Sequence, residues 1–132
     1  QKAMETWSRT EKERRIMTAL LALAWACLSI APDLCGTVLM MAREESSFNP
    51  AVVSRTGATG LLQLQPYVVG ESHEALLDPW TNARAGTRHI VWLSARYGDG
   101  WPSYYVCKTK TARAGLCRAG QRLERRLRGD GR

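Results

Sequence analysis

The apolar positions of the first third of the chain recur with helical spacing. Residues 11–29 form one predicted helix, with Ser8 or Thr10 as the residue that caps its first turn. A second helix is expected over residues 32–45, because leucine and valine positions repeat every three or four residues and a proline suits the first turn. Both helices are expected to be largely buried.

The rest of the chain adds a third long helix over residues 81–97, ended by a Gly-Asp-Gly turn, and a basic helix over residues 118–128. Residues 54–60 are expected to form a loop rich in Ser, Gly and Thr, and residues 68–78 an irregular surface segment. No stretch shows the strict alternation that is typical of a strand. The sequence therefore predicts an all-α (mostly α) single domain over residues 1–132.

Residues 16–32 are uncharged and directly follow the charged residues 12–15, a pattern that also suits a short membrane anchor. The run is shorter than the roughly 20 residues that a membrane span needs. It also contains Thr18 and Ser29. We therefore predict a buried core helix here, and a membrane anchor is the less favoured alternative.

The net charge of +7 is concentrated at the C-terminal end of the chain. Residues 1–107 hold equal numbers of basic and acidic side chains, whereas residues 108–132 hold nine basic and two acidic ones. A basic tail of this kind favours an anionic partner: a cell-wall polymer, nucleic acid, lipid headgroups or an acidic protein surface. The alternative is a solvated helix end that binds nothing.

The four cysteines show no C-x-x-C spacing, and the two histidines do not complete a ligand set, so neither a metal nor a cofactor is expected. Two short-range pairs, Cys27–Cys35 and Cys107–Cys117, are plausible disulfides, which would indicate an oxidising compartment. Four buried free thiols are the alternative.

Residues 42–66 are the most informative part of the chain. Glu45 lies at the end of the second apolar helix and is followed by a Phe-Asn-Pro stop, a glycine-containing loop and an apolar segment with two glutamines. This order suits a carboxyl group held in a semi-apolar cleft. Such a carboxyl has a raised pKa and can act as a general acid near neutral pH.

This stretch resembles the lytic transglycosylase family, relatives of goose-type lysozyme, in which a helix ending in Glu-Ser-x-Phe-Asn-Pro precedes a Gly-Ala-x-Gly-Leu loop. The resemblance extends more loosely over residues 78–97. It implies a lysozyme-like fold and cleavage of the MurNAc–GlcNAc β-1,4 bond in peptidoglycan glycan strands. The matching residues are Glu45, Ser46, Phe48, Asn49, Pro50, Ser54, Gly57, Ala58, Gly60, Leu61, Gln63 and Pro66.

The resemblance implies that Glu45 is the catalytic residue. It would act first as an acid and then as a base on the sugar's own 6-hydroxyl, giving a 1,6-anhydro product without a second carboxylate. Ser46, Ser54 and Gln63 are the expected substrate-binding residues of the same cleft. Helix capping is the alternative for Ser46, and a hydrogen bond that ties the loop is the alternative for Gln63.

A Tyr-Asn-Ala-Gly segment usually contacts the catalytic Glu in this family. Here Tyr105 is the expected counterpart of that tyrosine, with Tyr104 as runner-up, and Val106 stands where Asn is common. The candidates for stacking on sugars are Trp80, Trp92 and Trp101. Helical spacing nevertheless predicts a core position for Trp92.

Two other functions stay open at this point. A hydrolytic muramidase would need a further carboxylate to direct water, such as Glu71 or Glu74. A structural component of a virion or a secretion apparatus could keep the fold and dock to other proteins through the basic tail. Nucleic acid is a less favoured partner. The expected location is extracytoplasmic, in the periplasm or cell wall, or virion-associated.

Overall fold

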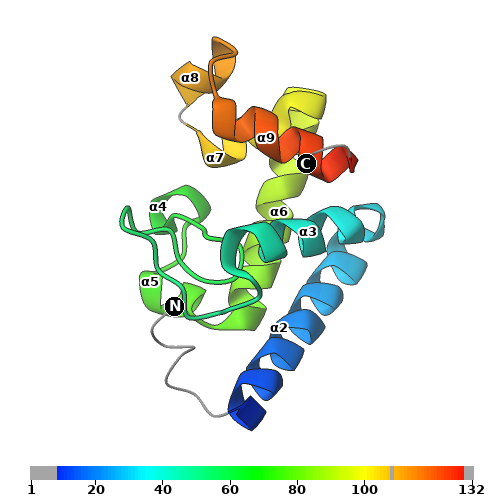
Figure 1. The fold of residues 1–132 in the computed structure, drawn as a ribbon, viewed down its shortest axis with the longest axis vertical. Coiled ribbons are helices and arrows are strands. Elements are labelled where there is room, and N and C mark those ends of the chain that lie inside the picture. Colours follow the sequence, from blue (N-terminus) through cyan, green and yellow to red (C-terminus); the bar gives the residue numbers. More distant parts are fainter. Residues whose placement is uncertain (1–8, 108, 130–132) are drawn as a thin grey trace. The chain divides into compact units, whose positions relative to one another are not determined.

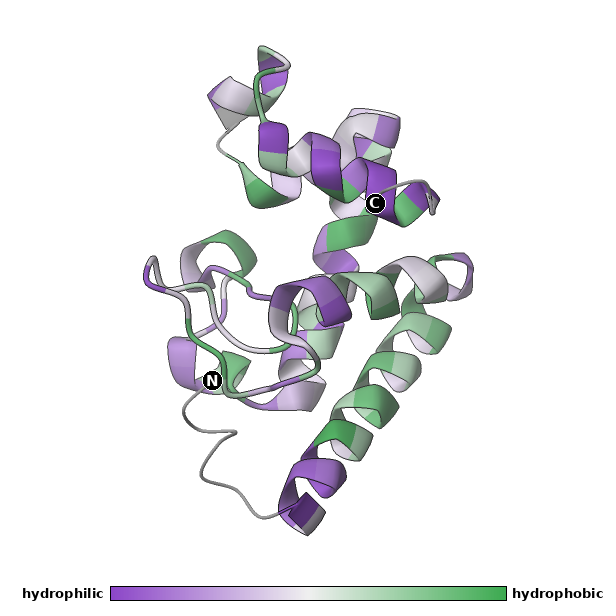
Figure 2. Cartoon of the chain, viewed as in Figure 1, coloured by the Kyte–Doolittle hydropathy of each residue, from purple (hydrophilic) through white to green (hydrophobic). Residues whose placement is uncertain are grey.

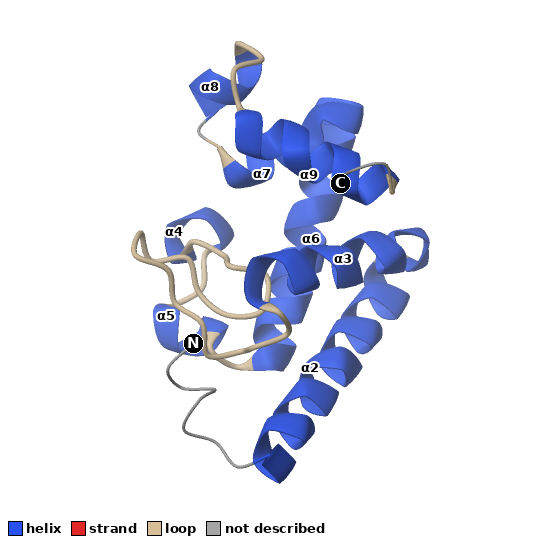
Figure 3. Ribbon diagram, viewed as in Figure 1, coloured by secondary structure: helices blue, strands red, loops and turns tan. Residues whose placement is uncertain are grey.

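The computed structural model of this chain describes residues 9–107 and 109–129 (Figure 1). Within these ranges every regular element is a helix (Figure 3), apart from the two isolated bridges Val53↔Thr59 and Thr59↔Leu64. The prediction of an all-α fold is therefore confirmed.

The chain divides into two compact units, Gln1–Arg88 and His89–Arg132. The prediction of a single domain over residues 1–132 stays a prediction. The first unit contains α2 (Arg9–Ile30), η1 (Pro32–Leu34), α3 (Cys35–Ser46), α4 (Pro66–Val69), α5 (His73–Leu76) and the first part of α6 (Pro79–Tyr97). The second contains the end of α6, then η2 (Gly98–Gly100), α7 (Trp101–Val106), α8 (Thr109–Arg113) and α9 (Arg118–Arg128).

Helix α2 begins earlier than the sequence predicts. Its first residue is Arg9, so Thr10 lies inside the first turn and does not cap it. Ser8, the other predicted cap, lies outside the described residues, as do Lys108 and residues 130–132 of the basic tail.

The prediction that α2 is a buried core helix is only half correct. Leu23 and several small residues face the core, and four large apolar side chains are 45–62% exposed on the other side: Met17, Leu21, Trp25 and Leu28. Figure 2 shows α2 as mostly apolar beyond its first turns. Because the helix is apolar all round, its pattern did not indicate which face packs inward. No helix among the described residues is long and apolar enough to cross a membrane.

Two features join α2 to α3. The helices pack against each other, and the disulfide Cys27–Cys35 links the end of α2 to the first residue of α3, with the two Cα atoms 5.1 Å apart. The predicted second helix is thus divided: Pro32 begins the short η1, and α3 begins at Cys35. The disulfide fixes the point from which α3 runs towards Glu45.

The segment predicted to be irregular, residues 68–78, lies mostly within two single-turn helices, α4 and α5. The Ser72 hydroxyl caps α5 by accepting a hydrogen bond from the Ala75 amide at 3.0 Å. Single turns are too short to show a helical period, which explains why the sequence pattern missed them.

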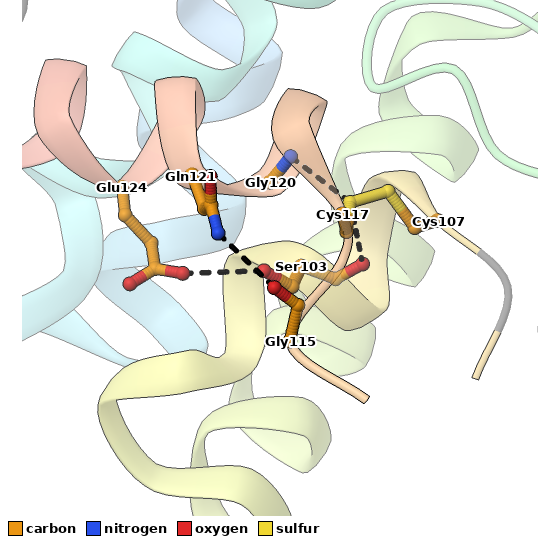
Figure 4. Close-up of a disulfide and its surroundings, with 7 residues drawn as sticks. All are labelled: Ser103, Cys107, Gly115, Cys117, Gly120, Gln121 and Glu124. Carbon is orange, nitrogen blue, oxygen red and sulfur yellow. Dashed lines mark hydrogen bonds between the residues drawn. A yellow bond between two sulfur atoms is a disulfide. The ribbon is translucent and has the colours of Figure 1, made fainter. Parts of the chain in front are cut away.

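The second unit is built around the packing of α7 against α9. Gly120 of α9 lies so close to Ser103 of α7 that a side chain there would have no room. The Ser103 hydroxyl bonds the Glu124 carboxylate at 3.2 Å, and the predicted disulfide Cys107–Cys117 is present beside them (Figure 4). Helix α9 has the bounds that the sequence predicts.

Candidate functional site

Glu45 lies one residue before the end of α3, and it is half-buried. The chain then turns sharply, because Ser47 and Phe48 both adopt left-handed conformations, with φ of 54° and 64°. Left-handed backbone is unfavourable for residues other than glycine, and such strain is concentrated at functional sites. The strained turn directs the following loop back towards the end of α3.

Burial and, to a smaller extent, the negative charge of Glu44 together raise the pKa of Glu45 to about 7. Glu44 itself lies 3.7 Å from the Arg43 guanidinium. At neutral pH a large fraction of the Glu45 carboxyl therefore holds its proton, as a general acid must.

Ser46 connects α3 to the loop. Its buried hydroxyl lies 2.8 Å from the Leu61 carbonyl and 3.0 Å from the Ala42 carbonyl one turn back in α3. A hydroxyl has one proton, so it donates to one of these carbonyls at a time. Ser46 thus holds Leu61 against the end of α3, next to Glu45.

Ser54 closes the glycine-containing loop upon itself. Its amide donates to the Ala58 carbonyl at 2.8 Å, and its hydroxyl accepts from the Ala58 amide at 3.0 Å. The turn between them needs Gly57 at φ 96°, a conformation that residues with a side chain rarely adopt. In the structure Ser54 therefore makes loop-closing contacts, and its contact with substrate stays a prediction.

Gln63 lies in the same loop with φ 50° and uses both amide hydrogens to tie it together. Its Nε2 donates to the carbonyls of Val52 and Gly60, each at 3.0 Å. These bonds are the loop-tying alternative that was predicted for Gln63 beside its binding of substrate. A role for Gln63 in binding stays a prediction, and it would fall to the acceptor oxygen of the amide.

Asn82 is a residue of this site that sequence reasoning did not single out. Its buried side chain donates to the carbonyls of Thr59 and Leu76 at 2.8 and 2.9 Å, and accepts from the Leu62 amide at 2.9 Å. One amide on α6 thereby fixes the loop at Thr59 and Leu62 and also binds the end of α5 at Leu76. The Asn-x-x-x-Gly pattern at the start of the third helix was the available signal.

Two glycines leave room for this arrangement. Gly60, at φ 77°, lies against the Asn82 side chain, and a side chain on Gly86 would overlap Leu62. The loop can therefore lie directly on α6. Ser46, Ser54 and Gln63 thus belong to one hydrogen-bonded substructure of the first unit, and Glu45 directly precedes Ser46 in α3.

Tyr104 and Tyr105 lie on α7 in the second unit, within an aromatic cluster. The Tyr104 ring stacks on Tyr97 at 3.6 Å, and Tyr105 lies 5.6 Å from His89 and 6.0 Å from Trp101, measured between ring centroids. Burial lowers the pKa of His89, which favours the neutral imidazole. The predicted contact of Tyr105 with the catalytic Glu stays a prediction.

Trp92 belongs to the same cluster, but the prediction that it lies in the core is wrong. It is 56% exposed, and the Arg96 guanidinium lies 6.0 Å from its ring centroid. Helical spacing indicates only that residues share a face of the helix. The face of α6 that carries Trp92 is exposed to solvent at that residue.

The two further carboxylates lie on or beside α5: Glu74 is exposed and Glu71 is half-buried. A cavity of about 360 Å³ in the first unit is lined by residues other than the predicted site residues: Arg14, Arg15, Thr18, Pro50, Ala51, Leu77 and Pro79. Among the described residues, no group of three His, Cys, Asp or Glu side chains could hold a metal ion.

The chain is similar to one known protein family and to several of its members. The profile of the family described as "Transglycosylase SLT domain" matches residues 34–109, more than half of the chain. The chain is 35% identical over 75 residues to Membrane-bound lytic murein transglycosylase C of Shigella sonnei (strain Ss046), covering 48% of this chain and 21% of that protein. It is 35% identical over 72 residues to Soluble lytic murein transglycosylase of Escherichia coli (strain K12), covering 46% of this chain and 11% of that protein.

These alignments thus span about a fifth and about a tenth of the two relatives' own lengths. No solved structure matches the chain. The matched residues 34–109 include Glu45, the loop and Asn82, as well as the tyrosines of α7.

Proposed function

The chain belongs to the transglycosylase SLT domain family, as its motif resemblance predicts, and we propose that it is a lytic transglycosylase of peptidoglycan. It would cleave the β-1,4 bond between MurNAc and GlcNAc and form a 1,6-anhydro product. The observation that carries the proposal is Glu45, a half-buried carboxyl with a pKa of about 7 at the family's acidic position.

The reaction needs one carboxyl group in two protonation states. Protonated Glu45 gives its proton to the glycosidic oxygen as the bond from that oxygen to C1 of MurNAc breaks, and the GlcNAc leaves with a hydroxyl group. The resulting carboxylate then takes the proton of the MurNAc 6-hydroxyl while that oxygen bonds to C1. Glu45 ends protonated as it began, and no water is consumed.

The pKa of Glu45 suits both halves of this cycle. A carboxyl with a pKa near 7 is protonated often enough to act as an acid, and its conjugate base is strong enough to accept a hydroxyl proton. The Ser46 and Asn82 hydrogen bonds support the reaction indirectly, because they hold the loop that lies beside α3.

The test is cleavage of purified sacculi followed by mass analysis of the soluble products. We expect 1,6-anhydro muropeptides from the unmodified protein and none from Glu45→Gln, which cannot give up a proton. Glu13→Gln, an exposed carboxylate on α2, is the matched control and should cleave normally. Full cleavage by Glu45→Gln would refute the proposal.

The same products decide between the enzymatic alternatives. Muropeptides with reducing ends would show hydrolysis, and a loss of cleavage in Glu71→Gln would then identify the second carboxylate. We expect anhydro products and normal cleavage by Glu71→Gln.

We also propose an extracytoplasmic location, in the periplasm or cell wall. Both units contain a disulfide, and disulfides persist in oxidising compartments. The proposed substrate lies in the same place. Association with a virion or a secretion apparatus through the basic C-terminal segment is a further proposal, and co-purification of the chain with such a particle would test it.

A further inference from the structure

The two units of this chain differ sharply in charge. Gln1–Arg88 holds nine basic and nine acidic side chains, whereas His89–Arg132 holds ten basic and three acidic ones. The whole net charge of +7 therefore belongs to the second, smaller unit. The proposed catalytic carboxyl lies in the unit with no net charge.

Helix α9 displays much of this charge on one face. Arg118, Arg122 and Arg125 are exposed, and at 100° per residue they lie within about 60° of each other around the helix. They extend over about 10 Å of its length, at 1.5 Å per residue. The opposite face is apolar and is buried through Gly120 and Leu123.

The packing of α9 holds this face outward. Gly120 lies against Ser103 of α7, and Glu124, the one acidic residue of α9, is turned to the Ser103 hydroxyl at 3.2 Å (Figure 4). Among the ion pairs that the described residues make, none involves Arg118, Arg122 or Arg125. The three guanidinium groups thus point away from the packed side of the helix without an acidic partner from this part of the chain.

We infer that this arginine face, defined as Arg118, Arg122 and Arg125, binds the peptide carboxylates of peptidoglycan and retains the protein on the wall. The inference rests on the proposed function for the identity of the polymer. Guanidinium groups present paired N–H donors that match a carboxylate, and an exposed array of them suits a polymer that carries carboxylates at intervals.

A lipid surface fits the face less well. A helix that lies in a membrane interface inserts an apolar face beside its basic one. The apolar face of α9 is already buried against α7, so the helix has nothing to insert. Nucleic acid is also disfavoured, because the disulfides of both units indicate an oxidising compartment outside the cytosol.

The test measures binding to purified sacculi by co-sedimentation, in a Glu45→Gln background that leaves the polymer intact. We expect the triple variant Arg118→Gln, Arg122→Gln, Arg125→Gln to bind about tenfold more weakly, since exposed charge pairs contribute modestly and add up. Binding by the parent should weaken as salt rises. The matched control is Arg9→Gln, Arg14→Gln, Arg88→Gln, which removes the same charge from the first unit and should bind normally. Circular dichroism verifies that both triple variants are folded.

Chemical treatment of the polymer identifies the bound group. Amidation of the sacculus carboxylates should abolish the difference between the parent and the arginine variant, whereas removal of wall phosphodiesters with hydrofluoric acid should not. Equal losses in both triple variants, or a loss caused only by phosphodiester removal, would overturn the inference. Tighter binding to anionic vesicles or to DNA than to sacculi would overturn it as well. Because binding is measured without cleavage, a failure of the proposed catalytic role of Glu45 would be seen separately.

Discussion

Glu45 and Glu44 are adjacent carboxyl groups with different surroundings. Glu44 lies beside the Arg43 guanidinium, whereas Glu45 is half-buried and has a pKa raised first by burial and then by the charge of Glu44. Glu44→Gln removes that second contribution, so it should lower the pKa of Glu45. A general acid is active while protonated, and kcat/KM should therefore begin to fall at a lower pH than in the unmodified protein.

This prediction is tested by the pH profile of cleavage. The unmodified protein should lose activity as pH rises through about 7, the pKa of Glu45. Glu13→Gln, a neutralised carboxylate on the exposed part of α2, should keep the original profile. A profile of Glu44→Gln that coincides with the control would show that the two carboxyls do not interact.

The same raised pKa has a cost in stability. The folded protein holds the Glu45 proton up to about pH 7 and the unfolded chain up to about 4.5, so stability falls as pH rises between these values. Glu45→Gln removes this dependence. We expect the variant to be more stable than the unmodified protein above pH 7, by about 3 kcal/mol, and equally stable below pH 4.

Urea denaturation at the two pH values measures this difference. A stability gain for Glu45→Gln that is the same at both would contradict the raised pKa. Glu74→Gln, an exposed carboxylate on α5, should show neither effect.

At the scale of elements, the loop after α3 depends on its close approach to α6. A side chain on Gly86 would overlap Leu62, whose amide is bonded to Asn82. Gly86→Ala should therefore destabilise the protein by about 1–3 kcal/mol, as overpacking does. Gly36 is the matched control: it lies in α3 with nothing near its missing side chain, so Gly36→Ala should stabilise by about 0.5–1 kcal/mol.

Thermal unfolding of the two variants is the measurement, and cleavage provides a second readout. Displacement of Leu62 would also disturb the loop tied to Ser46, so we expect Gly86→Ala to lose cleavage activity. Equal stability of the two alanine variants would mean that Leu62 moves aside without cost.

Elements with two distinct faces were predictable from the sequence, and elements without them were not. Helix α9 alternates basic and apolar positions at helical spacing, and its predicted bounds are those of the structure. Helix α2 is apolar on both sides, so its exposed face could not be inferred. Within the site, the motif identified Glu45, but two of the three bonds of Asn82 join residues 20 or more positions apart, which local spacing does not reveal.

At the scale of the whole molecule, the two units depend on their disulfides to different degrees. Among the residues that the structure describes, the fully buried large side chains lie mostly in the first unit, including Leu23, Met41, Leu61 and Leu62, whereas the second contributes Ile90. Small cores often need cross-links to be stable. The second unit should therefore depend more strongly on Cys107–Cys117 than the first does on Cys27–Cys35.

Replacing both cysteines of one pair by serine tests this difference. Each bridge closes a loop of similar length, with sequence separations of 8 and 10, so the entropic loss should be similar, about 2–3 kcal/mol in each case. The consequences should differ, because the Cys107/Cys117 variant has little buried apolar surface to resist opening. Hydrogen exchange should show lost protection across α8 and α9 in that variant, and a smaller loss near the α2–α3 junction in the other. Equal protection of α9 in both variants would instead mean that the contacts of Gly120 and Glu124 with α7 suffice to hold the arginine face in place.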